Sequence, residues 1–549
     1  MTGAQILVEE LINQGVDTVF GYPGGQVLNI YDELYKNAHR IKHILTAHEQ
    51  GAVHAADGYA RVLDKPGVVI ATSGPGATNL VTGIANAYLD SIPVIAITGN
   101  VSTELLGRDS FQEVDIVGIT QPIVKHNYIV RDVADLERII KEAFLIANTG
   151  RKGPVLIDLP KSVQVSEWEY KNEAKVSVKN LVPSGNCDIS EAVEAIKRSK
   201  RPFIYCGGGV SAAGAGEEIM ALSRKLSAPV GLSMMGISSI PHSFEYNLGM
   251  CGMHGRYASS AAQANADLII AAGVRFSDRA TGNTREYSKR CTVIHIDIDA
   301  SEIGKNVSPK IGLCGDIKTV IKRLINEVPE QKNAQWLKDI EEFKAVETGF
   351  TNGSFNPKNI INLINSSFDE DTVVATDVGQ HQMWVAQHYR FEKSRRLLTS
   401  GGLGTMGFGM GAAIGGCIAN DRKPTVLFTS DGSFGMNLIE MATAVSNNLP
   451  LVVVVLNNGT LGMVRQWQTA FFEKRYSNTT LDRKTDFPLL AKAFGAKGYS
   501  AETLEQLRDI VENKLDFNGP SLIDCKIDKD ERVLPFIPPG GSIKDIVLN

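Results

Sequence analysis

The sequence predicts an α/β protein built from three doubly wound parallel-sheet domains. Its 549 residues exceed what a single hydrophobic core ordinarily supports. Short apolar runs bounded by glycine and proline alternate with helical patterns, as is typical of βαβ units. One strand–turn–helix–strand segment also recurs, at 68–100 and again at 425–457. We therefore predict a first domain over 1–165, a Rossmann-like middle domain over 187–325, and a third domain over 357–549 with the same fold as the first.

Composition excludes several classes of function. A net charge of −5 does not indicate a nucleic-acid footprint. No run approaches the roughly 20 apolar residues of a membrane span, and the first residues form a helical pattern where a signal peptide would stand. The seven cysteines are scattered without a Cys-x-x-Cys pair, so neither zinc nor a disulfide framework is indicated. We expect a cytoplasmic protein that binds no nucleic acid and no membrane.

The first domain opens with a strand that ends near Phe20 and enters the turn 21–25, where glycines allow close backbone approach to a ligand. A later strand leads to Glu49, just before a helix of small apolar residues over 52–63. A glutamate in a first helical turn gains about 0.3–1 kcal/mol from the helix dipole. Taken alone, Glu49 is better explained by this capping role than by catalysis.

The recurring segment shifts the interpretation of Glu49 towards a catalytic role, because it relates the first domain to the third. When 68–100 is aligned with 425–457, Gly74 takes the position of Asp431 and Asn100 takes the position of Asn457. We infer two copies of one domain, of which the first has lost an acidic residue at the end of its strand.

The middle domain begins with a strand over 202–206 that enters three glycines. A strand over 293–298 carries Asp297, placed as an acceptor for a ribose hydroxyl would be in a nucleotide-binding fold. A tight packing turn explains the glycines equally well. The polar stretches 166–185 and 325–357 are predicted as linkers on either side, the second containing a charged helix.

The third domain opens with a strand over 372–376, followed by Gln380 and His381 and by a glycine-rich stretch over 400–406. Glycine density lets backbone amides face phosphate oxygens, with Gln380 and His381 as side-chain donors. For His381, a structural role within the core is an equal alternative.

A metal site is predicted at the carboxyl edge of this third sheet. The apolar strand 424–429 leads into Asp431, and the buried strand 451–456 leads into Asn458, which lies 27 residues later. Carboxylate and amide oxygens suit the octahedral oxygen shell of Mg²⁺. Either half alone could be an ordinary surface turn or strand exit. The joint spacing favours a magnesium-held diphosphate.

This stretch resembles the signature of thiamine diphosphate enzymes, a Gly-Asp-Gly turn followed by an Asn-Asn pair. Asp431 and Asn458 match the metal ligands of that family, and Thr460 matches the residue that offers a backbone carbonyl. Ser430 departs from the pattern, since it replaces the first glycine. The resemblance implies a cofactor held between a pyrimidine-binding first domain and a diphosphate-binding third domain. The positions matching cofactor contacts are Tyr22, Pro23, Gly24, Gly25, Gln380, His381, Gly404, Met406, Gly432, Ser433 and Met463.

Across its whole length the chain resembles the catalytic large subunits of acetohydroxyacid synthase, also called acetolactate synthase. The matching motifs are FGYPGG (20–25), HEQGAVHAADGYAR (48–61), TSGPGATN (72–79), FQEVDIVGIT (111–120), GPVLIDLPK (153–161), GMHG (252–255), GVRFSDR (273–279) and GMVRQWQ (462–468). The resemblance implies that pyruvate is decarboxylated and its hydroxyethyl unit is joined to a second 2-ketoacid, pyruvate or 2-ketobutyrate. The product would serve branched-chain amino acid biosynthesis.

The resemblance also assigns roles to six catalytic positions. Glu49 would face the aminopyrimidine ring of the cofactor and exchange a proton with it, while Met406 would support the bent cofactor from below. Arg279 would pair with the carboxylate of the acceptor. Trp467 would set the size of the acceptor pocket, although packing within a helix over 462–468 explains this tryptophan better in isolation. The two remaining positions, at the mouth of the channel, are Gln112 and Lys161.

The family carries FAD in its middle domain, and the residues matching its FAD contacts are Arg151, Gly207, Gly208, Met253, Gly273, Arg275, Asp297 and Asp316. Two alternatives stay open: an FAD-independent catabolic acetolactate synthase and a flavoenzyme of the pyruvate oxidase type. A non-catalytic paralogue is disfavoured because Glu49 and Asp431 are both present. Glyoxylate carboligase is disfavoured because it lacks the glutamate that Glu49 matches.

The resemblance implies a homodimer or homotetramer with shared active sites. Three domains account for the whole length, so any regulatory subunit is expected to be a separate chain. The C-terminal residues 535–546 are predicted to form a lid, with a disordered tail as the alternative.

Overall fold

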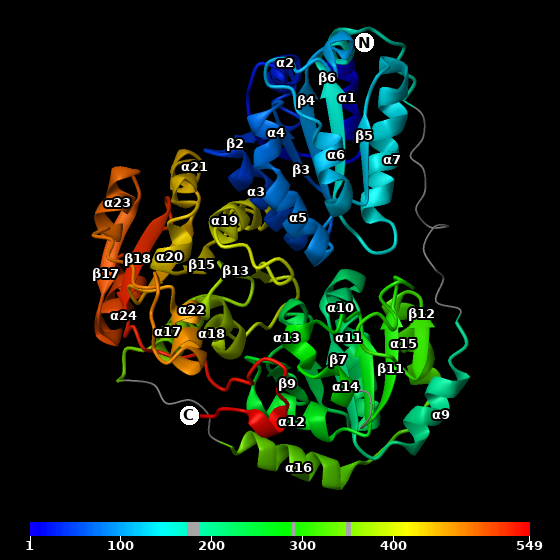
Figure 1. Cartoon of the computed structure of the whole chain (residues 1–549), viewed down its shortest axis with the longest axis vertical. Helices are drawn as coiled ribbons and strands as arrows, with labels where there is room; N and C mark the ends of the chain where they lie inside the picture. Colours follow the sequence, from blue (N-terminus) through cyan, green and yellow to red (C-terminus); the bar gives the residue numbers. More distant parts are fainter. Residues whose placement is uncertain (173–186, 288–290, 347–352) are drawn as a thin grey trace.

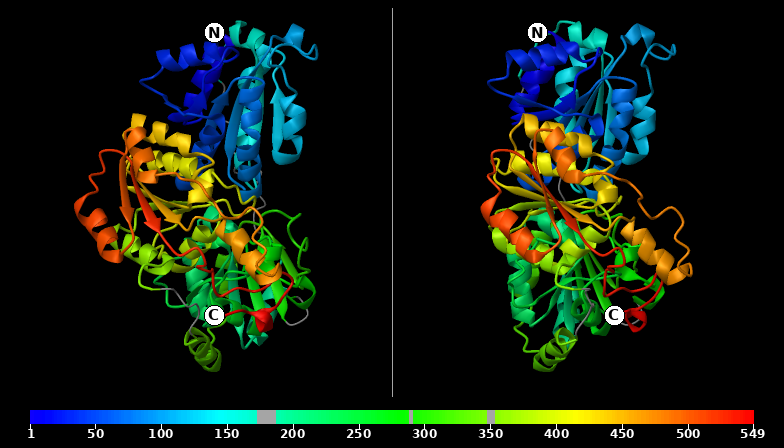
Figure 2. Two further views of the ribbon diagram at one scale, coloured as in Figure 1. Left: turned by 60° about the vertical axis from the view of Figure 1, so that its left-hand side comes forward. Right: turned by 90° about the vertical axis from the view of Figure 1, so that its left-hand side faces the viewer.

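The computed structural model describes residues 1–172, 187–287, 291–346 and 353–549. They form three six-stranded sheets, parallel throughout, with helices packed on both faces (Figure 1). The predicted fold class is confirmed. The third domain lies between the first and the middle domains, and the C-terminus runs back onto the middle domain (Figure 2). None of the helices in the described ranges is long and apolar enough to cross a bilayer.

The first sheet lies within residues 18–160 and has the strand order β2-β1-β3-β4-β6-β5. Its strands are β1 (Thr18–Tyr22), β2 (Lys42–Leu45), β3 (Gly67–Ala71), β4 (Val94–Asn100), β5 (His126–Ile129) and β6 (Val155–Pro160). Its helices are α1 (Gly3–Asn13), α2 (Leu28–Lys36), α3 (Glu49–Leu63), α4 (Pro75–Asn79), α5 (Val81–Asp90), α6 (Ile116–Thr120), α7 (Leu136–Asn148) and α8 (Lys161–Val165).

The third sheet repeats this topology, with the order β14-β13-β15-β16-β18-β17. Its strands are β13 (Val373–Thr376), β14 (Leu397–Leu398), β15 (Thr425–Thr429), β16 (Leu451–Asn457), β17 (Lys497–Ala501) and β18 (Ser521–Lys526). Its helices are α17 (Pro357–Ser367), α18 (Gln380–His388), α19 (Phe408–Ala419), α20 (Asp431–Phe434), α21 (Met441–Ser446), α22 (Gly462–Phe471), α23 (Phe487–Ala493) and α24 (Leu504–Asn513). The similarity of the two domains inferred from the recurring segment is therefore confirmed.

The middle sheet has the order β12-β11-β10-β7-β8-β9, the arrangement of a Rossmann fold. Its strands are β7 (Pro202–Cys206), β8 (Val230–Leu232), β9 (Asn247–Met250), β10 (Leu268–Ala272), β11 (Thr292–Asp297) and β12 (Ile311–Cys314). Its helices are α9 (Ser190–Arg198), α10 (Gly208–Ala213), α11 (Gly216–Leu226), α12 (Tyr257–Asn265), α13 (Asp278–Thr281), α14 (Thr284–Tyr287), α15 (Ile317–Glu327) and α16 (Ala334–Lys344).

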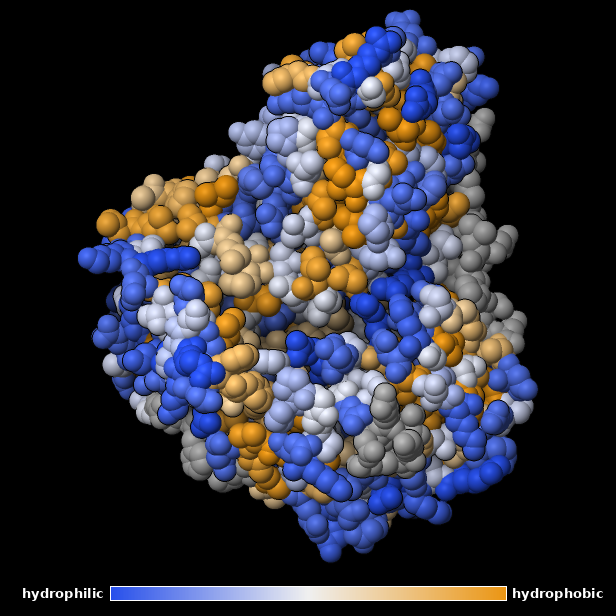
Figure 3. Space-filling view, in the orientation of Figure 1, coloured by the Kyte–Doolittle hydropathy of each residue, from blue (hydrophilic) through white to orange (hydrophobic). Residues whose placement is uncertain are grey.

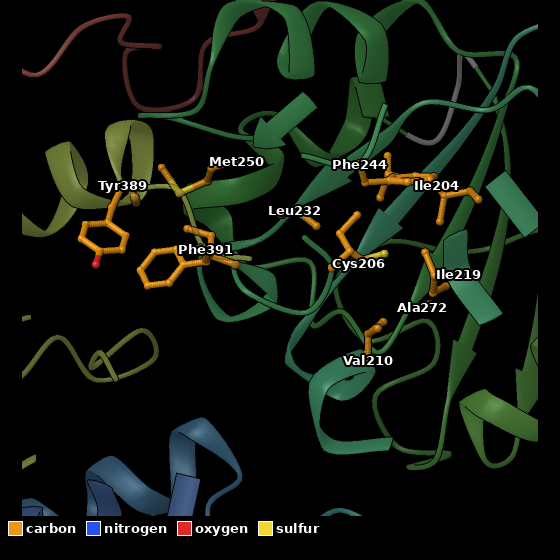
Figure 4. Packing of buried hydrophobic residues seen from close by; sticks show 14 of the residues in the cluster. Ile204, Cys206, Val210, Ile219, Leu232, Phe244, Met250, Ala272, Tyr389 and Phe391 are labelled. Atoms are coloured by element: carbon orange, nitrogen blue, oxygen red, sulfur yellow. The ribbon is translucent and has the colours of Figure 1, made fainter. Parts of the chain in front are cut away.

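Two kinds of packing join the domains. The first and third meet where α3 crosses α19, and small residues let the two backbones touch. A Cβ on Gly415 would lie 1.8 Å from the carbonyl oxygen of Ala55. The middle and third domains share one apolar core, in which Tyr389 and Phe391 lie beside Met250 (Figure 4). The relative placement of the three domains is thus set by close packing.

Several local predictions differ from the structure. Strand β1 continues past Phe20 to Tyr22, because Tyr22 still pairs with Ala71 of β3. The single helix expected after Asp431 is broken into α20, a 3₁₀ turn at Leu438–Glu440 and α21. Parts of both predicted linkers fall on 173–186 and 347–352, outside the described residues.

Candidate active site

The third domain brings its predicted cofactor residues to one edge of its sheet. Strands β13, β15 and β16 end side by side, and the chain then enters α18 at Gln380, α20 at Asp431 and the turn at Asn458. Because parallel strands end at a common edge, residues far apart in sequence meet there. Asn458 Nδ2 donates to Gln380 Oε1 at 3.2 Å, so two of these three segments are in direct contact.

Asp431 is a buried carboxylate with one oxygen, Oδ1, that is not hydrogen-bonded by the described residues. Burial raises the pKa of Asp431 to about 6. In the described part of the chain, no three His, Cys, Asp or Glu side chains gather to hold a metal. A cation here would take one carboxylate from the protein and its other ligands from neutral protein oxygens, a bound anion and water.

The polar atoms near Asp431 are of the kinds that bind an anion together with a metal ion. The Nε2 of His381 is buried without a partner among the described residues, and burial lowers the pKa of His381 to about 3, so the ring is neutral. Asn458 Oδ1 accepts from the backbone N–H of Thr460 at 3.2 Å. A Cβ on Gly462 would lie 2.0 Å from Gln380 Oε1, so the glycine leaves room for the Gln380 side-chain amide.

Asp377 forms hydrogen bonds both to β15, the strand that leads to Asp431, and to the residues that follow Met406. One oxygen of this buried carboxylate accepts from the backbone N–H groups of Gly407 and Gly409, at 2.9 and 2.8 Å. The other accepts from Thr429 Oγ1 at 2.8 Å. Sequence reasoning missed Asp377 as a functional residue, although it directly follows β13 in the motif that supplies Gln380.

The first domain gathers a second group at the carboxyl edge of its own sheet. Glu49 is the first residue of α3, and Asn79 Nδ2 of α4 donates to its Oε2 at 3.0 Å. A Cβ on Gly76 would lie 3.3 Å from Glu49 Oε1, so the glycine leaves room for the carboxylate. Gly24 follows the neighbouring strand β1, and a Cβ on it would lie 2.5 Å from Thr72, which follows β3. The predicted turn at Tyr22 to Gly25 therefore lies on this edge.

Gln112 and Lys161 lie at the same edge of the first sheet. The backbone of Gln112 packs against Gly74, whose Cβ would be 2.8 Å from the Gln112 carbonyl oxygen. Gln112 itself has φ of 58°, in the left-handed region. Lys161 opens α8 directly after β6 and is exposed.

The polar groups at the two edges make no direct side-chain hydrogen bond to each other among the described residues. Among the described residues, the one side-chain hydrogen bond of Glu49 goes to Asn79, and none reaches Asp431 or Gln380. The link between the domains near Glu49 is Glu440, which accepts from the backbone N–H groups of Ala47 and His48 at 3.2 and 2.9 Å. Glu49 and Asp431 thus belong to two groups of polar residues, one at the edge of each sheet, which we term half-sites.

A third group comes from the middle domain and α22. The Arg279 guanidinium lies over the Trp467 ring, 5.3 Å from its centroid. Arg279 Nη1 also lies 3.7 Å from Met253 Sδ. Beyond them the C-terminal segment docks, because the Ile537 N–H donates to the Met253 carbonyl oxygen at 2.8 Å. This segment, predicted as a lid, packs on the middle domain.

A cavity of about 1890 Å³ lies where the three domains meet. All eight residues matched to FAD contacts line it: Arg151, Gly207, Gly208, Met253, Gly273, Arg275, Asp297 and Asp316. Arg279, Trp467, Gly404 and Met463 line the same cavity, whereas Glu49 and Asp431 do not. One continuous space thus connects the predicted flavin positions with the acceptor and cofactor positions.

The walls of this cavity hold charged and buried polar groups. Arg151 Nη1 pairs with Glu302 at 2.8 Å, and the Glu302 side chain is 2% exposed. Burial raises the pKa of Asp297 to about 6. Asp316 accepts from the backbone N–H of Thr319 at 2.8 Å, so its carboxylate also caps α15.

Each of the three domains matches a known domain family. Residues 1–119 match the thiamine pyrophosphate enzyme N-terminal TPP binding domain, 189–324 its central domain and 377–525 its C-terminal TPP binding domain.

Relatives that match over nearly the whole chain lead to the same family. The acetolactate synthase large subunit of Lactococcus lactis subsp. lactis (strain IL1403) is 43% identical over 98% of this chain and 95% of its own length. The acetolactate synthase isozyme 2 large subunit of Escherichia coli (strain K12) is 42% identical over 100% of this chain and 99% of its own. The probable acetolactate synthase large subunit of Methanocaldococcus jannaschii is 42% identical over 100% and 95%. The chain therefore belongs to the acetolactate synthase large-subunit family of thiamine pyrophosphate enzymes.

Proposed function

We propose that this chain decarboxylates pyruvate and joins the two-carbon unit to a second 2-ketoacid, giving 2-acetolactate or 2-aceto-2-hydroxybutyrate. One observation supports the proposed ligation step. Arg279 and Trp467, from two different domains, lie in contact within the cavity that also contains Gly404 and Met463. An arginine beside an indole offers a carboxylate partner and a shaped apolar wall.

The first half-site supplies the acid–base group. Thiamine diphosphate, when bound, supplies the electron sink for decarboxylation and carbon–carbon bond formation. The chain's own contribution would be the Glu49 carboxylate, which accepts a hydrogen bond from Asn79 and would exchange a proton with the aminopyrimidine nitrogen. General acid–base help of this kind contributes about 10²–10⁴-fold.

The second half-site would hold the diphosphate through Mg²⁺. Asp431 Oδ1, Asn458 Oδ1 and the Thr460 carbonyl oxygen are the proposed protein ligands, supported by the missing partner of Asp431. Gln380, His381, Gly432 and Ser433 would face the diphosphate. Met406 would lie under the thiazolium ring, held by the contacts of Asp377 to the following glycine.

FAD is proposed for the middle-domain side of the cavity. The support is that Arg151, Arg275 and Asp297 line one space with the glycines at the ends of β7 and β10. A Cβ on Gly207 would lie 1.9 Å from the Gly273 carbonyl oxygen, so these two turns can lie in contact only as glycines. Because this flavin site adjoins the acceptor residues, a pyruvate oxidase-type activity is the second candidate.

A homodimer is proposed because each chain holds two half-sites. Exposed apolar side chains lie beside both: Phe111, next to Gln112, is 84% exposed, and Met436, near Asp431, is 60% exposed. Apolar side chains also gather around α4 and α5 and around α21 and α23 (Figure 3). Such patches mark surfaces that a partner covers. A separate small subunit is proposed because the relatives are named as large subunits.

The test is a pyruvate assay with thiamine diphosphate and Mg²⁺, with and without FAD, following carbon dioxide and acetolactate together. We expect one acetolactate per carbon dioxide, dependence on FAD, and a fall of about 10²–10⁴-fold in Glu49→Gln. Glu104→Gln, an exposed glutamate of the same domain, is the matched control. Carbon dioxide with dye reduction and no acetolactate would show the oxidase instead, and activity indifferent to FAD would show the catabolic synthase.

A further inference from the structure

A buried polar network ties the segment 399–407, which carries Gly404 and Met406, to the first domain of the same chain. Asp90, the last residue of α5, accepts from the backbone N–H of Gly402 at 2.7 Å and from that of Gly401 at 3.2 Å. Arg61 of α3 donates to the carbonyl oxygen of Thr399 at 2.9 Å. Two helices of the first domain thus hold one end of the segment.

Asn86 of α5 adds a second set of contacts. Its Oδ1 accepts from Ser400 Oγ at 2.5 Å and from Thr405 Oγ1 at 3.3 Å. The Thr405 backbone N–H in turn donates to Ser400 Oγ at 2.9 Å. The residue directly before Met406 is therefore fixed through Ser400 to the first domain.

The network is charged, paired and shielded from water. Arg61 forms ion pairs with Asp57 and, at 2.8 Å, with Asp90, and the side chains of both aspartates are 0% exposed. Asn86 Nδ2 donates to Asp57 at 3.0 Å and closes the network. Removing one partner of a buried pair is costly because the other charge is left without compensation.

Beyond Met406 the chain is anchored on the third domain. Asp377 accepts from the Gly407 backbone N–H at 2.9 Å, and Asn437 Nδ2 donates to the Gly407 carbonyl oxygen at 3.1 Å. Residues 403–406 therefore lie between contacts to both domains at 399–402 and contacts to the third domain at Gly407, because Gln382 of the third domain also donates to the Ser400 carbonyl oxygen at 3.0 Å. The position of Met406 depends on both.

The end of α5 also contacts residues from the flavin side of the cavity. Arg275 Nη1 donates to the carbonyl oxygen of Leu89 at 2.6 Å, and Arg151 Nε donates to Ser91 Oγ at 2.8 Å. Residues 89, 90 and 91 thus contact three different partners, which are Arg275, the segment 399–407 and Arg151.

We propose that Asp90, together with Arg61 and Asn86, is a positioning residue that sets the height and direction of Met406 beneath the cofactor. This inference rests on the proposed function, because it assigns the network to the thiamine diphosphate site. Helix α3 then serves two sites: it begins at Glu49, which belongs to one half-site, and its last turn holds the Met406 segment of the other.

The test uses the full-length protein and the substitution Asp90→Asn, with thiamine diphosphate and Mg²⁺ as the probe. Loss of a charge-assisted contact should weaken cofactor binding about 10-fold to 100-fold by calorimetry. It should also change the near-ultraviolet circular dichroism of the bound cofactor and lower kcat while the KM for pyruvate stays near wild type. A network that only stabilises the fold would shift the melting temperature and leave the spectrum of the bound cofactor unchanged.

Two further variants keep the test decisive. Ser400→Ala removes the hydroxyl that donates to Asn86 and accepts from the Thr405 backbone N–H but leaves the Arg61–Asp90 pair, so it should show the same spectral change in a well-folded protein. Asp64→Asn breaks a different cross-domain pair, with Arg395 at 3.0 Å, and should bind the cofactor as wild type does. Wild-type binding and kcat in folded Asp90→Asn and Ser400→Ala would overturn the proposal. Failure of the wild-type chain to bind the cofactor would instead overturn the proposed function.

Discussion

At the scale of single residues, two buried aspartates of the third domain differ in how their charge is met. The oxygens of Asp377 accept from two backbone N–H groups and from Thr429, so this carboxylate is satisfied by the protein itself. Asp431 Oδ1 has no such partner among the described residues, and burial raises the pKa of Asp431 to about 6. A structural role suits the first carboxylate, and cation binding suits the second.

Asp158 gives a pH prediction that is independent of any cofactor. Burial raises the pKa of Asp158 to about 7, although Asn100 and Thr98 donate hydrogen bonds to it. Because the folded state then keeps a proton that the unfolded state loses, stability should fall as pH rises from 4 to 7, by about 1.4 kcal/mol per unit for this group.

The measurement is the melting temperature of wild type minus that of Asp158→Asn, followed from pH 4 to pH 8. The difference should fall with rising pH and level off above about pH 7. A difference that stays constant across this range would show that Asp158 is already ionised in the folded protein at pH 4.

Asp431 and Asn458 could be predicted as metal ligands from the sequence because the spacing of strand ends along one sheet is visible in the chain itself. No role could be assigned to Asp90, Arg61 or Asp377 in this way. Asp90 and Arg61 contact the segment 399–407, which is more than 300 residues away along the chain, and Asp377 is bonded to Gly407, Gly409 and Thr429. No local pattern encodes a contact between domains.

At the scale of elements, α22 of the third domain meets the short helix α13 of the middle domain through Trp467 and Arg279. Arg279→Gln should lower kcat/KM for acetolactate about 10-fold to 100-fold, because one charge-assisted pairing with the acceptor is lost. Carbon dioxide release should fall less, since a two-carbon unit that meets no acceptor can take up a proton and leave as acetaldehyde, which frees the site for another pyruvate.

The ratio of acetolactate to carbon dioxide is the deciding quantity. Arg138→Gln, an exposed arginine of α7, is the matched control and should keep the wild-type ratio. Equal losses of both products in Arg279→Gln would place this residue in an earlier step than ligation.

The contact between α3 and α19 gives a stability prediction. A methyl group on Gly415 would lie 1.8 Å from the Ala55 carbonyl oxygen, so the helices must move apart. Gly415→Ala should destabilise the protein by about 1–3 kcal/mol, which is the usual cost of overpacking. Gly519→Ala, at a position with open space, should melt as wild type does. An unchanged melting temperature in Gly415→Ala would show that the two helices pack less closely than described.

Strand positions were easier to predict than helices. The apolar runs that became β7, β15 and β16 are short, continuous and bounded by glycine, proline or polar residues. The helical stretch after Asp431 was predicted as one element, but it is broken around Gly435 and Asn437. Asn437 Nδ2 donates instead to the backbone of Gly407. A tertiary contact thus overrides the local helical pattern.

At the scale of the whole molecule, duplication explains both the fold and the division of the site. Two domains with the same strand order each carry polar residues at the carboxyl edge of their sheets. Within one chain the first and third domains pack through α3 and α19, and no hydrogen bond among the described residues joins Glu49 to Asp431. A second copy of the chain, arranged with two-fold symmetry, would supply the missing half to each.

The most direct test of this account mixes two inactive variants. Glu49→Gln and Asp431→Asn are each purified, combined, dissociated and reassociated, and acetolactate formation is measured. If sites are shared, half of the dimers are mixed and one of their two sites is intact, so about a quarter of wild-type activity should return. No recovery, with mixed dimers demonstrated by mass, would contradict the account and place Glu49 and Asp431 of one chain in the same site.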